Sequence, residues 1–261
     1  MTRSSTPLTA ASLTAAALIA FAVTANASAA VVDGYTLSGA DLDTITVDGV
    51  TRSAGDLING TLTGYEDDNN TQLAVNTGGS VPAVRADVLS DLTLTTGLLN
   101  AKSVTFAFDQ PVLNASDTSF DIVFFDWGAF SGDEYDVTIN GVTTGFDPGD
   151  IAFTLALPRL DIDFFTSNES TAATSVADLE ARTFPSGFGE SNSATAVVGI
   201  NLFDFGVPVG GSVTSITITD DDGTTSVDPM LILGVQPVPE PSSAAVVLAG
   251  LFGLTARRRR A

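Results

Sequence analysis

The chain has 261 residues, of which 31 are acidic and ten are basic, and its formal net charge is −21; it contains no cysteine and no histidine. These two absences exclude disulfides, Cys/His zinc sites, thiol nucleophiles and a Ser-His-Asp triad. Nucleic acid is excluded as a partner because its binding requires clustered positive charge. Hydrophobic residues make up 44% of the chain and include 16 Phe, so the composition favours a packed core over disorder.

Charge divides the chain into three parts. Residues 1–30 contain no acidic residue, whereas residues 31–236 hold 30 acidic and five basic residues, a formal net charge of −25. Four consecutive arginines occupy positions 257–260. The two basic ends therefore have a different role from the acidic body between them.

Residues 1–30 have the composition of a secretory signal peptide. Arg3 supplies a positive start, residues 10–23 are apolar apart from one Ser and one Thr, and small residues follow in an A-x-A pattern at 25–29. The apolar stretch is shorter than the roughly 20 residues that a membrane span needs, which favours cleavage over an uncleaved anchor. We therefore expect export through the Sec translocon and processing by signal peptidase.

The body, residues 31–236, alternates apolar and polar residues with period 2, the pattern of β-strands. Threonine is frequent and favours strands over helices. The clearest alternating runs lie at 104–108, 135–139, 151–157 and 215–219. The segments 120–125, apart from Asp121, and 197–205 are apolar on both faces and are predicted to be central strands.

Glycine-containing turn signals separate these runs. Asn140-Gly141, directly after the run at 135–139, predicts a tight hairpin. The only helical pattern is at 176–182. The polar segment 166–174 is expected to be a mobile surface insertion.

Short strands without long helices indicate an all-β fold, a single large β-sandwich or jelly roll over residues 31–236. A length of 206 residues suits one large β domain. Two smaller domains, with a boundary near the sequence GGSVP at 78–82, stay open as an alternative.

Two groups of carboxylates could bind Ca²⁺, which takes six to eight oxygen ligands. The first group is Asp126, Asp133, Glu134 and Asp136, and the second is Asp220, Asp221, Asp222 and Asp228. The second group is no EF-hand, because Thr225 stands where the loop needs glycine. Two interpretations stay open: a structural calcium in a jelly-roll loop, or solvated hairpins on an acidic surface.

Exposed aromatic side chains could stack sugars, and Trp127, Tyr65 and Tyr35 are the candidates. The segment 120–128 resembles a strand and loop of galactose-binding-like jelly rolls, and the alternative role of Trp127 is packing at a strand end. Glycoside hydrolysis needs two carboxylates about 5–10 Å apart, and the sequence nominates no such pair. We therefore expect no enzyme.

Residues 237–261 combine three elements in order. A proline-rich element at 238–241 (VPEP) precedes an apolar run at 244–254 and the arginines at 257–260. Proline cannot continue a helix or a strand ladder, so the first element is an extended, accessible tether. Residues 242–256 would form a helix of about 22 Å, which spans a hydrocarbon core of about 30 Å only with arginine snorkelling and bilayer thinning. By the positive-inside rule the arginines stay cytoplasmic, so the body lies outside the inner membrane.

This order of elements resembles the PEP-CTERM sorting signal of bacterial surface proteins over residues 238–260. The resemblance implies that an exosortase, a membrane transpeptidase, cuts near the proline-rich element and releases the body or transfers it to the envelope, often in bacteria that make extracellular polysaccharide. The implied substrate residues are Val238, Pro239, Glu240 and Pro241, and the implied cytoplasmic stop is Arg257, Arg258, Arg259 and Arg260. The alternative is an ordinary C-terminal anchor.

Together these features predict an exported protein that is anchored in the inner membrane, then processed and placed at the cell surface or outside the cell. Its expected role is structural or adhesive, in association with exopolysaccharide. The alternative function is a carbohydrate-binding, lectin-like jelly-roll module.

Overall fold

The computed structural model describes residues 32–38, 41–47, 49–76, 84–90, 92, 96–127, 135–146, 154–169, 171–185, 187–220 and 227–236. The predicted signal peptide at 1–30 and the predicted sorting signal at 237–261 lie outside these ranges. Within them the chain forms thirteen β-strands and one short α-helix, which confirms the predicted all-β fold. No helix of the described ranges is long and apolar enough to span a membrane.

The strands form two antiparallel sheets. The smaller sheet has the order β1 (Val32–Ser38), β2 (Asp41–Val47) and β3 (Val50–Ser53). The larger has the order β4-β13-β7-β11-β10-β5-β6-β12-β8-β9. Its strands are β4 (Leu57–Ile58), β5 (Gly60–Asn76), β6 (Thr96–Leu113), β7 (Ile122–Trp127), β8 (Tyr135–Ile139), β9 (Val142–Phe146), β10 (Thr154–Thr166), β11 (Gly187–Ile200), β12 (Ser212–Asp220) and β13 (Pro229–Val235).

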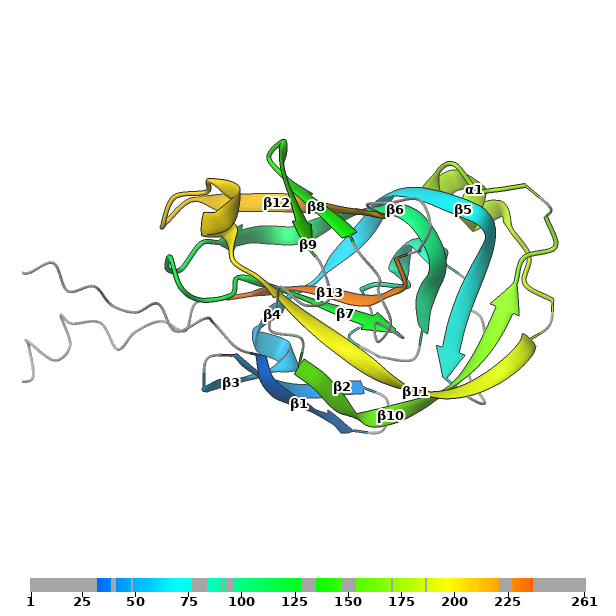
Figure 1. Ribbon diagram of the computed structural model, residues 1–261, viewed down its shortest axis with the longest axis horizontal. Helices are drawn as coiled ribbons and strands as arrows, with labels where there is room; N and C mark the ends of the chain where they lie inside the picture. The colour runs from blue at the N-terminus through cyan, green and yellow to red at the C-terminus, as the bar shows by residue number, and fades with distance from the viewer. Residues whose placement is uncertain are drawn as a thin grey trace, which may run out of the picture.

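The ten-stranded sheet folds over into two layers (Figure 1). β6, β12, β8 and β9 form the upper layer, and β13, β7, β11 and β10 form the lower one, with the β1–β3 sheet beneath. The long strands β5 and β6 curve between the layers. Ala101 of β6 exchanges two backbone hydrogen bonds, of 3.1 and 2.9 Å, with Val227, two residues before β13. The sheet therefore meets itself at this point, and the layers enclose a core.

β7 separates two apolar clusters. Ile122 and Phe124 belong to the cluster between the two layers, whereas Val123 and Phe125 belong to a second cluster shared with the β1–β3 sheet. The rings of Phe125 and Tyr35 meet edge to face at 5.3 Å. Because a strand covered on both faces has no polar alternation, the prediction of a central strand at 120–125 is confirmed.

Several local predictions are also confirmed. The runs at 104–108 and 135–139 alternate buried and half-buried residues as expected. The β8–β9 hairpin turns at Asn140 (φ 52°) and Gly141 (φ 79°), the two left-handed residues that a type I′ turn requires. The predicted helix is α1 (Val176–Ala181), in which Ser175 accepts a hydrogen bond from the Asp178 N–H as an N-cap.

Two local predictions are wrong. β11 ends at Ile200, and the 3-10 turn η3 (Leu202–Phe205) replaces the expected continuous strand. The Asn201 side chain accepts from the Phe203 N–H, and Gly206 (φ 72°) supplies the left-handed stop, so local polar contacts end the strand.

The second error concerns the segment 166–174, which is not a surface insertion throughout, because some of its described residues are buried; its mobility stays a prediction. Ser167 and Ala173 are buried. The buried Arg182 guanidinium donates to Ser167 Oγ at 3.1 Å and to the Thr171 carbonyl at 2.6 Å. Arg182, which follows α1, thus holds the segment 166–174. Nothing in the sequence of that segment indicates this contact.

Candidate functional site

Strand pairing brings acidic residues from both predicted calcium groups to one end of the two layers, which we call the acidic end. It comprises Asp126, Asp136, Asp220 and Asp228. Asp220, the last residue of β12, is the Cα partner of Tyr135 in β8, and Asp126 of β7 is the partner of Pro229 in β13. Strand pairing therefore places side by side two groups that lie far apart in the sequence.

Asp126 and Asp220 are buried, so neither is part of a solvated hairpin. Alternation along β7 places Asp126 on the same face as Phe124, toward the core between the layers. Asp228 is half-buried, and its Oδ1 accepts a 2.7 Å hydrogen bond from the Asn100 backbone N–H. A buried carboxylate is costly unless polar groups compensate it, and the Asn100 N–H is one such group at the acidic end.

The other members of the two groups, Asp133, Glu134, Asp221 and Asp222, lie outside the described residues. In the part of the chain that is described, no three acidic side chains are grouped so that they could hold a metal ion. The calcium interpretation therefore stays a prediction.

Two of the three aromatic candidates for sugar stacking are buried. Tyr35 and Tyr65 are buried, so the prediction that they present a face to a ligand is wrong: both rings pack in the core. The backbone of Trp127 ends β7 opposite Thr195 of β11, while its side chain lies outside the description. Its role as a ligand residue stays a prediction.

A second polar centre, at the opposite end of β7, surrounds Asp121. Its carboxylate accepts the backbone N–H of Ala115 at 3.0 Å and that of Leu202 at 3.1 Å. Its own N–H donates to the Ile200 carbonyl at 2.9 Å, and its carbonyl accepts from the Val235 N–H at 2.7 Å. This one residue thus joins the loop after β6, the turn η3 and the end of β13. We call this the exit end, because the described chain leaves β13 here.

Burial raises the pKa of Asp121 from its ordinary value of 3.8 to about 6, against the opposing effect of the two backbone N–H groups from Ala115 and Leu202. Asn114 supports the same corner. Its backbone N–H donates to the Gly211 carbonyl at 2.9 Å, and its Nδ2 donates to the Val207 carbonyl at 2.6 Å. The exit end is therefore a structural joint in which every donor named here has an acceptor, while the buried Asn114 Oδ1 has no hydrogen-bond partner among the described residues.

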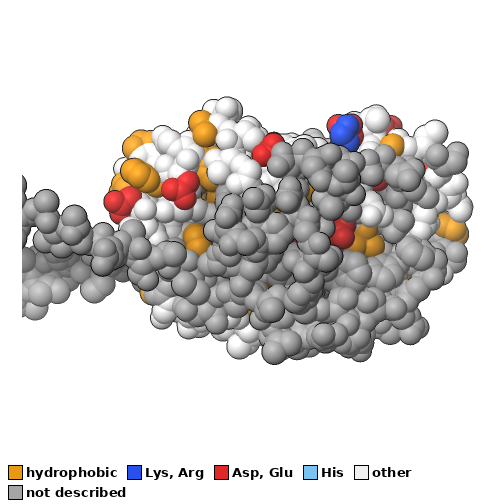
Figure 2. All heavy atoms as spheres, in the orientation of Figure 1, with side chains coloured by type: hydrophobic (Ala, Val, Ile, Leu, Met, Phe, Trp, Pro, Cys, Tyr) orange, Lys and Arg blue, Asp and Glu red, His pale blue; other side chains and the backbone are white. Residues whose placement is uncertain are grey.

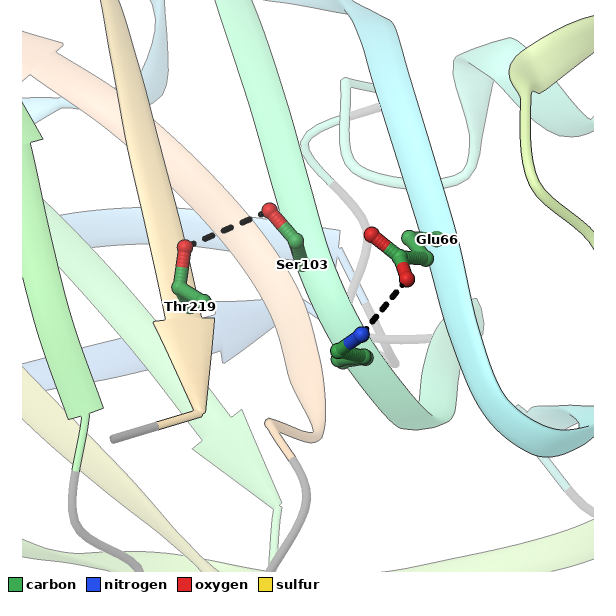
Figure 3. A network of polar contacts seen from close by, with 4 residues as sticks. Glu66, Ser103 and Thr219 are labelled. Carbon is green, nitrogen blue, oxygen red and sulfur yellow. Dashed lines mark hydrogen bonds and ion pairs between the residues drawn. The ribbon is translucent and has the colours of Figure 1, made fainter. Parts of the chain in front are cut away.

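The outer face of the upper layer carries paired hydroxyl groups, and we call it the hydroxyl face. The pairs join Ser103 to Thr219 at 3.3 Å, Thr105 to Thr217 at 2.9 Å, and Thr138 to Thr143 at 2.8 Å. Figure 3 shows the first pair, which bridges β6 and β12. The hydroxyl face arises because the alternate residues of the same strands, among them Val104 and Ile218, face the core.

This surface carries few charges although the body is strongly acidic. Asp136 alternates with the buried Tyr135 and Val137 and lies opposite Thr219, so its side chain is on this face. The side chains of Lys102 and Glu66 border it and form a 2.7 Å ion pair (Figure 3). A hydroxyl has one donor and two acceptor sites, and each pair uses only one of each. The remaining sites and the threonine methyl groups suit a neutral, hydroxyl-rich polymer better than an ionic ligand.

The sequence interpretation missed Asp121 as a joint and missed the hydroxyl face. A weak signal for Asp121 was present, since it is the one carboxylate in the apolar segment 120–125. The hydroxyl face had no sequence signal, because the pairing of β6 with β12 joins residues more than 100 positions apart.

Comparison with known proteins adds no relative to these observations: no family model, no curated protein and no solved structure matches the chain.

Proposed function

We propose that this protein is an exported, non-enzymatic component of a bacterial cell envelope. In this proposal the tail at 237–261 holds the β body at the outer side of the inner membrane until an exosortase processes it at Val238, Pro239, Glu240 and Pro241. The observation that carries the proposal is the order of the three tail elements, which ends in four arginines. The acidic charge of the body supports it, because such a surface stays soluble outside the cell.

Replacing Glu240 by Ala, or deleting residues 257–260, tests the sorting step. We expect unprocessed precursor to accumulate at the inner membrane, measured by pulse-chase and fractionation. Asp204→Ala is the matched control, because it removes an exposed carboxylate from the body and leaves the tail intact. Normal release of the Glu240→Ala protein would contradict the proposal.

The alternative function is a carbohydrate-binding jelly-roll module, and two observations favour keeping it. The chain crosses repeatedly between the layers, from β6 to β7 to β8 and from β11 to β12 to β13, as Greek-key sandwiches do. The hydroxyl face carries few charges and is rich in donors and acceptors. Neutral exopolysaccharide is the ligand class that fits this surface.

Affinity electrophoresis through gels that contain neutral polysaccharides tests this alternative. Thr105→Val with Thr217→Val removes one hydroxyl pair and keeps the side-chain shape, and we expect mobility retardation to fall several-fold. The matched control is Thr46→Val with Thr51→Val, a similar pair of 2.9 Å in the smaller sheet. Each pair contributes about 0.2–1 kcal/mol to sheet stability, so both variants should fold. Equal retardation of both variants would count against the hydroxyl face.

A further inference from the structure

The exit end holds most of the exposed apolar side chains of the described ranges. Leu113, Phe203 and Val209 are 42%, 48% and 56% exposed, and Val50 is 40% exposed. Only Val84 and Val142 complete the set of large exposed hydrophobics in the described part of the chain. Figure 2 shows apolar side chains, with acidic ones between them, at the end of the molecule where β12 begins.

Backbone contacts place these side chains around one point, the departure of the chain after β13. Phe203 follows Leu202, whose N–H binds Asp121, and Asp121 in turn binds Val235 at the end of β13. Leu113 pairs with Ser212, three residues after Val209.

The smaller sheet reaches the same point. Arg52 Nε donates to the Gln236 carbonyl at 3.2 Å, and Arg52 also donates to the Val50 carbonyl. Val50 therefore lies near the residue after which the tail begins.

The chain that continues from this point limits what can cover it. Only the seven residues 237–243 separate Gln236 from the apolar run at 244–254. Seven residues reach at most about 25 Å when fully extended. Any membrane that holds the apolar run therefore lies within about 25 Å of the exit end.

We propose that the exit end rests on the bilayer surface in the tethered precursor, with Phe203, Val209 and Leu113 in contact with lipid. This inference rests on the proposed function, because it needs the tail to be in the membrane. A short tether gives an effective concentration in the millimolar range, so a small apolar patch is sufficient for contact. Once processing cuts the tether, the same patch is too small to hold the body, and the body leaves.

Charge limits this contact to a shallow one. Asp204 and Asp117 are exposed at the same end, and they repel anionic headgroups while leaving zwitterionic lipid acceptable. The acidic end, at the far end of β7, faces away from the membrane in this arrangement. The orientation thus points Asp126 and Asp220 away from the bilayer and keeps the tail next to it.

Site-specific labels test the orientation. The chain has no cysteine, so Val209→Cys and Val84→Cys each give one site for an environment-sensitive fluorophore. Val84 is 48% exposed and precedes the 3-10 turn η2 (Arg85–Asp87), which packs against α1; it is the matched control. The labelled full-length chain is reconstituted into phosphatidylcholine vesicles that contain a lipid-bound quencher.

We expect the label at 209 to be quenched at least threefold more than the label at 84. Equal quenching in chains that float with the vesicles would overturn this inference alone. Failure of both chains to float with the vesicles would overturn the membrane tether, and this inference with it. A third chain that adds Phe203→Ser to the label at 209 should show reduced quenching without loss of flotation.

Discussion

The carboxylates at the two ends of β7 differ in what they contribute to the fold. At the exit end, Asp121 is buried, and both of its oxygens accept backbone N–H groups, so the carboxylate joins three segments. At the acidic end, Asp126 and Asp220 are buried, and further acidic residues follow each of them in the sequence. The difference shows that a net charge of −21 is not spread evenly over a solvated surface. Some carboxylates of this chain stabilise the fold, and the position of each in the tertiary structure determines whether it does so.

The largest expected effect is the loss of stability when the Asp121 carboxylate is removed. Asp121→Ala leaves two buried N–H groups without an acceptor, and each such group costs about 1–3 kcal/mol. We expect the free energy of unfolding, measured by urea denaturation, to fall by about 2–5 kcal/mol. Asp204→Ala, an exposed position two residues after Leu202, should change it by less than about 0.5 kcal/mol. A similar small loss for both variants would remove the distinction between structural and surface carboxylates.

The second prediction uses the raised pKa of Asp121. Its folded pKa of about 6 lies above the ordinary 3.8, so the fold favours the protonated form. The stability that this preference contributes is complete below about pH 3.8 and is lost as the pH rises through 6. Between pH 4 and pH 7 the wild type should lose up to about 3 kcal/mol more than Asp121→Asn, which does not titrate. Urea midpoints at the two pH values measure this difference, and parallel curves would contradict it.

The smallest effect concerns the acidic end. If Asp126, Asp220 and the neighbouring loops bind calcium with the weak affinity of extracellular sites, 10 mM Ca²⁺ should raise the melting temperature by about 3–8 °C over EDTA. Asp220→Asn should abolish the rise, whereas Asp204→Asn should keep it. An unchanged melting temperature in the wild type would contradict a calcium site at the acidic end.

Much of the fold could be predicted from local patterns. Alternation in β8 and the Asn140-Gly141 turn specified a hairpin, because period and turn chemistry agree there. The apolar segment that became β7 was predicted as central for the same physical reason, burial on both faces. The prediction at 197–205 was wrong because Leu202 and Phe205 of η3 are as buried as strand residues, while the Asn201 cap and Gly206 decide the conformation.

The candidate sites were less predictable. The carboxylates of the acidic end were identified as residues, but their assembly required the pairing of β12 with β8 and of β13 with β7. The rings of Tyr35 and Tyr65 were predicted to be exposed, but both are buried. A tyrosine in an alternating strand does not indicate which face of the strand packs against a second layer. Arg182 is similar: nothing near it in sequence indicates that it holds the segment at 166–174.

The sequence by itself determined the all-β class, the charge of each part and the order of elements in the tail, since these depend on composition and short-range period. Tertiary structure alone decided which carboxylates are buried, which hydroxyls form the hydroxyl face and which apolar side chains surround the departure of the chain. The physical reason is that each of these is a property of pairing between strands far apart in the sequence. Local periodicity sets the face on which a side chain lies, and only the partner strand determines what that face meets.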